Sequence, residues 1–465
     1  MYRNVEKDLL RWKKIPNKKA LFITGARQVG KTYSIREFGR NNYANFVEIN
    51  FIDMPEAKKG FEGSLRPEHL YMWIGMLSNR ALTQNQGSTL IFLDEIQECP
   101  QARTAIKFLV EDGRFDYIES GSLLGVSYKN VPSYPVGYEH HLSMYPMDFY
   151  EFCCAWGISQ EVFDYLETCY RERKTVEEGI HGQLLNLFRY YVLIGGMPDP
   201  VQTFIDFRDV VAVTDKQKTI LQMYRQDIRQ YVADGNLQKR IEEVFDRLPA
   251  ALAEKNRRFK IASLGKSARL REYEDAFLWL RDAGVALPCY NLSEPRMPLK
   301  LNEKSSLFKL FLSDTGLLCT MSFEENIQFK ILSGDLSVNM GSILENAFAQ
   351  ELVAHGFKLR YFNRHGIGEL DFVVQQGGEV AIVEIKSGED YRTHAALNNA
   401  LKIKEWGIKK ALVFCKGNVA QEGAVTYLPW YMTMFFKPES QMGSEPDELD
   451  SRVINQMLNH LPRES

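Results

Sequence analysis

Two glycines, a lysine and a threonine follow a short apolar run near the start of the chain, in LFITGARQVGKTYSI (21–35). Their spacing satisfies G-x-x-x-x-G-K-[ST] at Gly25, Gly30, Lys31 and Thr32. Glycines let the backbone curl so that several N–H groups point at one anion, and a helix starting near Lys31 adds its positive N-terminal end. Lys31 can reach the β- and γ-phosphates of a nucleotide, and Thr32 can ligate Mg²⁺.

The other reading of this stretch is a glycine turn that caps a helix and carries an incidental lysine. The buried strand before the turn and the helix after it weigh against that reading. We therefore expect the turn to hold nucleotide phosphates. The residues assigned to this role are Gly25, Ala26, Arg27, Gln28, Val29, Gly30, Lys31 and Thr32.

An acidic pair, Asp94 and Glu95, ends a second buried strand in STLIFLDEIQ (88–97). Open α/β sheets place their ligands at the carboxyl ends of parallel strands. We expect Asp94 to hold the Mg²⁺ shell and Glu95 to orient or deprotonate the attacking water, with Lys31 as the other catalytic residue. Together with the glycine turn, and in this order, the pair predicts binding and hydrolysis of ATP or GTP.

A third apolar strand is expected in FDYIESGS (115–122), which ends in Ser120 and Ser122. A polar residue at this position could sense hydrolysis beside the γ-phosphate, and we assign Ser122 to the nucleotide site. The alternative, a simple turn with capping serines, stays open.

A different set of polar residues, Asp371, Glu384 and Lys386, occurs in GELDFVVQQGGEVAIVEIKSG (368–388). The Gly-Gly pair at 377–378 is a strong signal for a two-residue hairpin turn. That turn would place Asp371 opposite Glu384, with Lys386 two residues further on the same face. Facing carboxylates repel each other, and a divalent cation between them would remove the repulsion.

An amphipathic helix expected over 341–356 precedes this hairpin and carries Glu345. The order of Glu345, Asp371, Glu384 and Lys386 resembles the PD-(D/E)xK nuclease fold. The resemblance implies a metal site at Glu345, Asp371 and Glu384, with Lys386 positioning water or stabilising charge on phosphorus. The alternative is an ordinary cross-strand salt-bridge cluster, because a fold does not establish a function.

The middle of the chain, from about residue 151 to 247, is mostly helical in pattern. The stretch KNRRFKIASLGKSARLR (255–271) then holds seven Lys/Arg and no acidic residue, and leads through a helix into an extended segment. Helix, turn, helix and hairpin predict a winged-helix unit, whose basic helix could contact the phosphates of DNA or RNA. The alternative is a module for interdomain or protein contacts.

The bulk composition sets the frame for these motifs. A length of 465 residues predicts two or three domains, and 45% apolar with 25% charged residues is normal for a soluble globular protein. The net charge of −3 argues neither for nor against a nucleic-acid partner. Seven cysteines without paired spacing fit reduced thiols. The charged N-terminus and short apolar runs predict a cytoplasmic protein without a membrane segment.

Six motifs occur in a fixed order along the chain: GARQVGKT, IFLDEIQ, ESGS, MYPMDFYEF (144–152), YYVLIGGMPDPV (190–201) and YRQDI (224–228). In this the chain resembles the prokaryotic AAA-type P-loop ATPases that carry a C-terminal domain of unassigned function. The resemblance covers nearly the whole chain and implies ATP rather than GTP. One departure is Gly137-Tyr138, where such proteins commonly have Gly-Arg. If that arginine touches nucleotide, its role here is vacant or filled by another residue.

The expected fold class is α/β. Its parts are an AAA-like P-loop ATPase domain with a parallel sheet (1–165), a helical and winged-helix region (166–335), a nuclease-like α/β domain (336–436) and an acidic tail (437–465). Two functions compete. In the first, ATP hydrolysis is coupled to binding or cutting of nucleic acid. In the second, a nucleotide switch binds a protein partner and its nuclease-like domain is silent. Whether the chain forms a homo-oligomer stays open.

Overall fold

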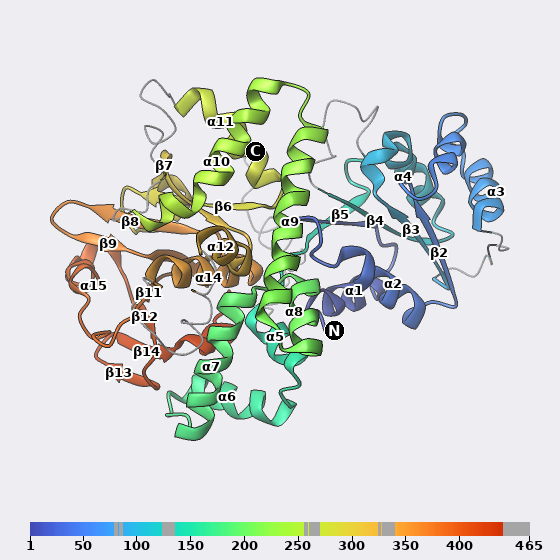
Figure 1. Ribbon diagram of the computed structural model, residues 1–465. Coiled ribbons are helices and arrows are strands. Elements are labelled where there is room, and N and C mark those ends of the chain that lie inside the picture. The colour runs from blue at the N-terminus through green and yellow to red at the C-terminus, as the bar shows by residue number, and fades with distance from the viewer. Residues whose placement is uncertain are drawn as a thin grey trace, which may run out of the picture.

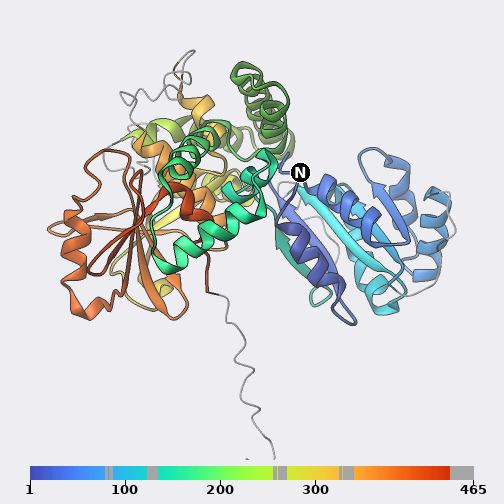
Figure 2. The same ribbon diagram turned by 90° about the horizontal axis from the view of Figure 1, so that it is seen from below.

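In the computed structural model, the described residues are 1–78, 82, 87–122, 135–254, 259, 270–323, 327 and 340–439. An N-terminal α/β domain lies at the right of Figure 1, long helices run through the centre, and a C-terminal α/β domain lies at the left. Seen from below, the N-terminal domain forms one lobe and the other regions form a second, with the N-terminus where the lobes meet (Figure 2).

The N-terminal domain is built on five parallel strands in the order β2-β3-β4-β1-β5. Every residue of β1 and β3 is buried, because helices cover both faces of the sheet. The elements are α1 (Val5–Lys13), β1 (Ala20–Gly25), α2 (Lys31–Asn42), β2 (Asn45–Asn50), α3 (Pro67–Ser78), β3 (Thr89–Asp94), α4 (Pro100–Asp112), β4 (Asp116–Ser122) and β5 (Glu139–Ser143). The expectation of an α/β fold with a parallel sheet is confirmed.

The middle region is helical and ends in an antiparallel hairpin. Its long helix α9 runs alongside the N-terminal domain (Figure 1). The elements are α5 (Phe149–Trp156), α6 (Gln160–Glu172), α7 (Glu178–Ile194), α8 (Pro198–Phe207), α9 (Val210–Tyr231), α10 (Gly235–Ala253), α11 (Leu270–Asp282), β6 (Ala286–Leu292), β7 (Glu303–Leu312) and α12 (Thr315–Ser322). Two helices followed by a hairpin are thus present at 235–312, whereas most of the basic stretch 255–271 lies outside the described residues.

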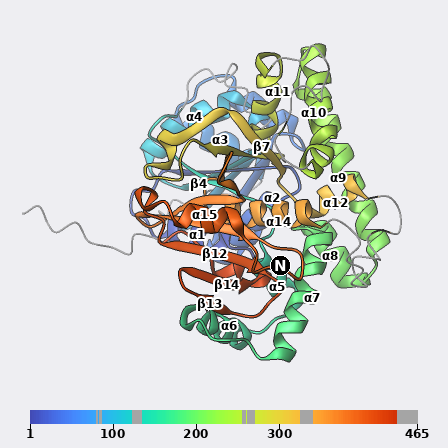
Figure 3. The ribbon, with the colours of Figure 1, turned by 90° about the vertical axis from the view of Figure 1, so that its left-hand side faces the viewer.

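The C-terminal domain holds a mixed five-stranded sheet of order β10-β11-β12-β14-β13. Three of its strands, β12, β14 and β13, lie toward the viewer in Figure 3. The elements are α14 (Gly341–Ala354), β8 (Arg360–Arg364), β9 (Gly368–Leu370), β10 (Phe372–Gln376), β11 (Glu379–Ile385), α15 (Ala395–Leu401), β12 (Lys410–Cys415), β13 (Ala420–Glu422) and β14 (Val425–Pro429). Most of the expected acidic tail lies outside the described residues.

A second sheet joins the middle region to the C-terminal domain. Its order is β7-β6-β8-β9, in which β6 pairs parallel with β8. One hydrophobic core is also continuous across the regions, from Ile35 under the N-terminal sheet through Tyr191 to Phe414 in the C-terminal sheet. The hairpin β6–β7 is therefore fixed on the C-terminal domain by backbone hydrogen bonds as well as by packing.

Two further observations concern the whole chain. All seven cysteines are free, and six of them are buried. Within the described residues, no helix combines the length and the apolar character that a membrane crossing requires.

Candidate functional site

The turn between β1 and α2 has the form of a phosphate-binding loop. A Cβ atom at Gly25 would lie 2.2 Å from the carbonyl oxygen of Met144, so the backbone can follow this path only with glycine. The ammonium of Lys31 lies inside the turn and donates hydrogen bonds of 3.0 Å to the carbonyl oxygens of Gly25 and Ala26. Burial lowers the pKa of Lys31 to about 8, although Glu95 and Asp94 oppose that shift.

Asp94 lies opposite Thr32, as the sequence predicts. The Thr32 hydroxyl donates to Asp94 Oδ2 over 3.0 Å. Asn50 donates to the same oxygen over 3.1 Å, and the Ser120 hydroxyl donates to the other oxygen of Asp94. Burial raises the pKa of Asp94, and the hydrogen bond from Ser120 opposes that shift. Sequence reasoning missed Asn50, although its place at the end of a strand next to β3 could have indicated it.

Glu95 follows Asp94 in a left-handed backbone conformation, with φ of 53°. This conformation turns the chain at the strand end, and Gln97 then donates a hydrogen bond to Glu95 Oε2. The backbone of Ser122 pairs with Gly25 at the end of β4, but its side chain lies outside the described residues.

A pocket of about 570 Å³ opens in front of these residues. It brings Lys31, Thr32 and Glu95 together with several side chains of α2 that the motif does not specify. The residues that line it are Arg27, Gln28, Gly30, Lys31, Thr32, Tyr33, Arg36, Glu37, Arg40 and Glu95. Tyr138, at the position where the resemblance expects arginine, instead donates its hydroxyl hydrogen bond to Glu111 on the surface. Arg27, Arg36 and Arg40 are the arginines of the pocket lining.

The hairpin β10–β11 has the predicted register. Phe372 pairs with Val383, which places Asp371 next to Glu384 at the end of the hairpin. The backbone N–H of Asp371 donates to Glu384 Oε1 over 3.4 Å, and Lys386 Nζ lies 3.5 Å from Glu384 Oε2. Burial raises the pKa of Glu384 to about 8, and the negative charge of Asp371 adds to this rise. The structure thus brings together all three residues that the sequence singled out in this segment.

Glu345 joins this cluster from α14, accompanied by two residues that sequence reasoning missed. Carboxylate oxygens of Glu345, Glu369 and Asp371 all lie within 4.8 Å of one another, a spacing that a metal ion could use. However, Lys309 Nζ lies 2.6 Å from Glu345 Oε1 and 2.7 Å from Glu369 Oε1. With this ammonium in place, the residues present do not fit a divalent ion. Sequence gave no signal for Lys309, because it comes from the hairpin of the middle region.

Comparison with known families shows what the segment around the first site is similar to. Residues 17–153 match the family described as AAA domain, and this match contains the whole nucleotide pocket. We therefore call this matched segment the AAA domain. The match supports nucleotide binding and hydrolysis by the pocket of this domain. Residues 185–328 and 340–432 match two domains of unknown function (DUF8612 and DUF4143), so the nuclease likeness of the C-terminal domain stays a prediction.

Similar solved structures include a Walker-type ATPase of Pyrococcus abyssi, with 14% identity and a TM-score of 0.41 over 69% of this chain and 96% of that one. AMPPCP-bound DnaA of Aquifex aeolicus has 13% identity and a TM-score of 0.27 over 60% of this chain and 85% of its own. ORC1 of Aeropyrum pernix, in complex with DNA, has 13% identity and a TM-score of 0.29 over 72% and 93%. No curated protein matches the chain in sequence.

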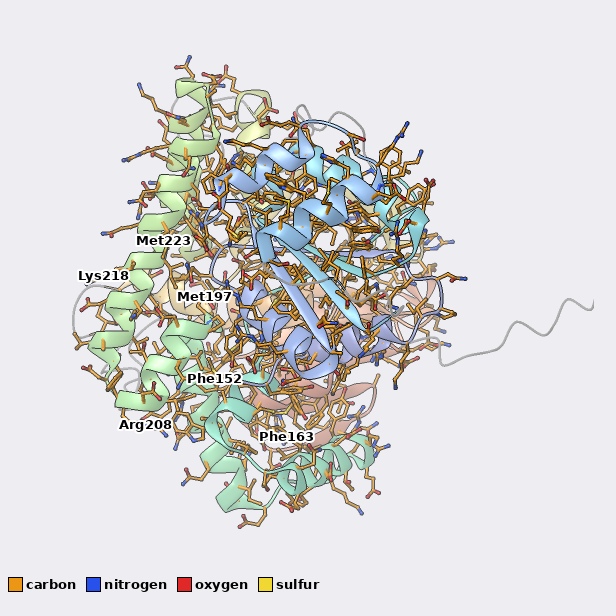
Figure 4. The ribbon with its side chains drawn as sticks, turned by 90° about the vertical axis from the view of Figure 1, so that its right-hand side faces the viewer. Phe152, Phe163, Met197, Arg208, Lys218 and Met223 are labelled. Atoms are coloured by element: carbon orange, nitrogen blue, oxygen red, sulfur yellow. The ribbon has the colours of Figure 1, made fainter. Side chains whose placement is uncertain are left out.

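The middle region contacts the phosphate-binding loop of the AAA domain directly. Arg27 donates a charged hydrogen bond to Asp227 of α9, and the Tyr224 hydroxyl donates to the carbonyl of Arg27 over 3.3 Å. Met223 of the same helix lies 3.9 Å from the Gln28 amide nitrogen, on the side of α9 that faces the AAA domain (Figure 4). The motif YRQDI is thus explained as a contact with the loop.

Gly284, which precedes β6, lies against the other side of this loop. A Cβ atom at Gly284 would lie 3.1 Å from the backbone nitrogen of Ala26. Gly284 also has φ of +70°, a conformation that side chains other than glycine adopt rarely. The start of the hairpin β6–β7 therefore approaches the loop closely, at a position where the backbone conformation favours glycine.

Arg3 connects the loop to the motif MYPMDFYEF. Its guanidinium donates to the carbonyl of Val29 over 2.6 Å, to the carbonyl of Tyr145 over 2.7 Å and to Glu151 Oε1 over 3.1 Å. Glu151 and Asp148 form a capping box at the start of α5. The start of α5 thus also binds the arginine that contacts the loop.

Helix α14 meets the same motif from the C-terminal domain. Glu351 Oε1 accepts hydrogen bonds from the Phe149 backbone N–H over 2.8 Å and from the Tyr191 hydroxyl over 2.6 Å. His355 Nε2 lies 3.5 Å from Asp148 Oδ2. One helix therefore carries Glu345 in the carboxylate cluster and Glu351 at the start of α5, about 9 Å apart along its axis from the helical rise.

Proposed function

We propose that this chain hydrolyses ATP with Mg²⁺ in the pocket of the AAA domain, and that its nucleotide state controls the contacts of the other regions. The observation that carries the proposal is the 3.0 Å hydrogen bond between Thr32 and Asp94, with Lys31 and Glu95 at the same pocket. Residues far apart in the chain are thus gathered where phosphates, a hard cation and a water would have to meet. The choice of ATP over GTP rests on the family resemblance.

Each residue has a distinct role in this proposal. The backbone N–H groups of the loop and the positive end of α2 bind the phosphates. Lys31 exchanges its hydrogen bonds to carbonyl oxygens for bonds to the β- and γ-phosphates. Thr32 and Asp94 would hold Mg²⁺, which neutralises charge on the phosphate oxygens. Glu95, oriented by Gln97, positions the attacking water and accepts its proton.

Lys31→Ala tests the binding part of the proposal. We expect ATP affinity to fall about 10- to 100-fold, because charged hydrogen bonds of this kind are worth about 1.5–3 kcal/mol. Equilibrium dialysis with labelled ATP and Mg²⁺ measures the change. Lys59→Ala is the matched control, since Lys59 is an exposed lysine of the same domain and lies outside the pocket lining. Failure of the wild-type chain to retain either ATP or GTP would refute the proposal.

The contacts of the loop offer a route from nucleotide to the other regions. Phosphates would compete with Asp227 for the guanidinium of Arg27, and a shift of Ala26 toward Gly284 would meet its backbone. Both partners belong to the middle region, which shares a sheet with the C-terminal domain. A change of nucleotide state would therefore alter how the middle region packs on the AAA domain.

For the C-terminal domain, the geometry favours the silent switch over the nuclease. Asp371, Glu384 and Lys386 lie together, which supports cutting of nucleic acid. However, Lys309 already pairs with Glu345 and Glu369, two carboxylates that a metal ion for cutting would need. Contact with DNA or RNA through the basic stretch 255–271 stays a prediction, because most of that stretch lies outside the described residues.

We expect no cleavage of labelled DNA or RNA with Mg²⁺ or Mn²⁺, with or without ATP. Gel analysis of wild type beside Lys386→Ala measures it, and retention of the labelled strands on the protein reports binding in the same samples. Cleavage by the wild type that disappears in Lys386→Ala would establish the nuclease and refute the silent switch.

A further inference from the structure

A lysine with no exposed surface points into the carboxylate cluster. Lys309 lies on β7, and its Nζ is 2.6 Å from Glu345 Oε1 and 2.7 Å from Glu369 Oε1. The same ammonium lies 4.9 Å from the centre of the Tyr361 ring. These partners come from α14, β9 and β8, so the lysine from the middle region is surrounded by elements of the C-terminal domain.

The position of Lys309 is explained by the charge around it. A buried ammonium without a partner costs several kcal/mol, whereas one that is paired and hydrogen-bonded can be accommodated. The aromatic face adds an attractive interaction with the cation. In return, the lysine relieves the repulsion between Glu345 and Glu369. The charged groups gathered here are Glu345, Glu369, Asp371, Glu384, Lys309 and Lys386.

A divalent ion would need the oxygens that Lys309 occupies. Hard cations bind carboxylate oxygens at about 2.0–2.6 Å, close to the distances at which Lys309 Nζ already lies from Glu345 and Glu369. The ammonium and an ion thus cannot share the space between those oxygens. Two cationic centres at such a separation also repel each other strongly where water is excluded.

We infer that Lys309 is the resident cation of the Glu345–Glu369–Asp371 cluster and closes it to Mg²⁺ and Mn²⁺, so that the C-terminal domain holds a latent metal site. The inference rests on the proposal that this domain does not cut nucleic acid, and it is independent of ATP hydrolysis. Lys309 lies on β7, which belongs to the hairpin of the middle region that starts beside the phosphate-binding loop. The cation that closes the cluster therefore comes from the middle region.

The test is a titration of the full chain with Mn²⁺ in the absence of nucleotide. The electron paramagnetic resonance signal of the free Mn²⁺ measures how much is bound. Lys309→Met keeps the length of the side chain and removes its charge. We expect this variant to gain one Mn²⁺ site with affinity about tenfold or more above any in the wild type, since a repelling cation is gone. Lys309→Met/Glu369→Gln should lose that site again, and Lys309→Arg should behave as the wild type.

A measurement on the wild type keeps the inference testable should Lys309→Met fail to fold. We expect Mn²⁺ binding to be the same in the wild type and in Glu369→Gln, a variant of a partly exposed residue. Mn²⁺ bound by the wild type and lost in Glu369→Gln overturns the inference. A folded Lys309→Met that gains no Mn²⁺ site also overturns the inference. If the wild type in addition does not cut nucleic acid, the proposed switch without nuclease activity is unaffected. Metal-dependent cutting by the wild type overturns both the inference and that proposed switch.

Discussion

Glu95→Gln is expected to bind ATP with an affinity within about threefold of the wild type while its rate of phosphate release falls about 100-fold or more. Glutamine keeps the size of the side chain and can still accept from Gln97, but it cannot take a proton from the attacking water. The residues proposed to bind the phosphates and Mg²⁺, Lys31 and Thr32, are untouched. Loss of turnover without loss of binding is therefore the signature of the role we propose for Glu95.

Phosphate release under saturating ATP and Mg²⁺, together with equilibrium dialysis, separates the two effects. Glu98→Gln is a suitable control, because Glu98 lies on the same turn and pairs with Lys58 instead of facing the pocket. It should retain both binding and turnover. Undiminished phosphate release by Glu95→Gln would show that Glu95 is not the base.

The features predicted correctly depend on residues that are close in sequence. The loop from Gly25 to Thr32 is a local pattern, and its strand and helix follow from the apolar residues around it. The register of the hairpin β10–β11 also follows from its two glycines, so the pairing of Asp371 with Glu384 could be derived by counting residues from the turn.

The features that sequence could not predict arise where distant segments meet. Arg3 lies 26 residues before Val29 and 148 before Glu151, so nothing in its own neighbourhood indicates its partners. Lys309 reaches Glu345 only because β6 pairs with β8 and places the hairpin of one region on another. The pattern of Asp, Glu and Lys suggested a metal, which stays a prediction, and the fold places the Lys309 ammonium beside two of the carboxylates of the cluster.

These long-range contacts also explain why several motifs outside the loop are distinctive. Asp148 and Glu151 start α5, yet they also meet Arg3 and His355. Gly196 of the motif YYVLIGGMPDPV donates its backbone N–H to Asp314 over 2.6 Å, which ties the turn after α7 to the start of α12. The first of these motifs is thus a junction between regions, and the second joins two helices of the middle region. The AAA domain is held in the chain by polar contacts that surround its nucleotide loop.

Arg3→Met tests this junction. We expect it to lower the apparent free energy of unfolding by about 3–5 kcal/mol at pH 8.5, because it leaves Glu151 buried without its counter-charge.

Burial already raises the pKa of Glu151 from 4.5 to about 7, and Arg3 is the largest influence opposing that rise. The folded chain therefore holds a proton on Glu151 that the unfolded chain releases, so this group's contribution to stability falls as pH rises from about 4.5 to 7. Without Arg3 the pKa moves higher and the fall continues to higher pH. The difference between Arg3→Met and the wild type should therefore be smaller at pH 6 than at pH 8.5.

Urea unfolding at the two pH values measures this difference, with Arg11→Met as the matched control. Arg11 lies on the same N-terminal segment, but its side chain is 78% exposed and pairs with Asp8 three residues before it. Its removal should cost less than about 1 kcal/mol at either pH. Because Arg3 also holds the carbonyl of Val29, Arg3→Met should weaken ATP binding, whereas Arg11→Met should not. Arg3→Met/Glu151→Gln should lose the extra dependence on pH, since the group that titrates is gone. Equal losses for the two arginine variants, or a loss that does not change with pH, would show that the loop is not held through this buried pair.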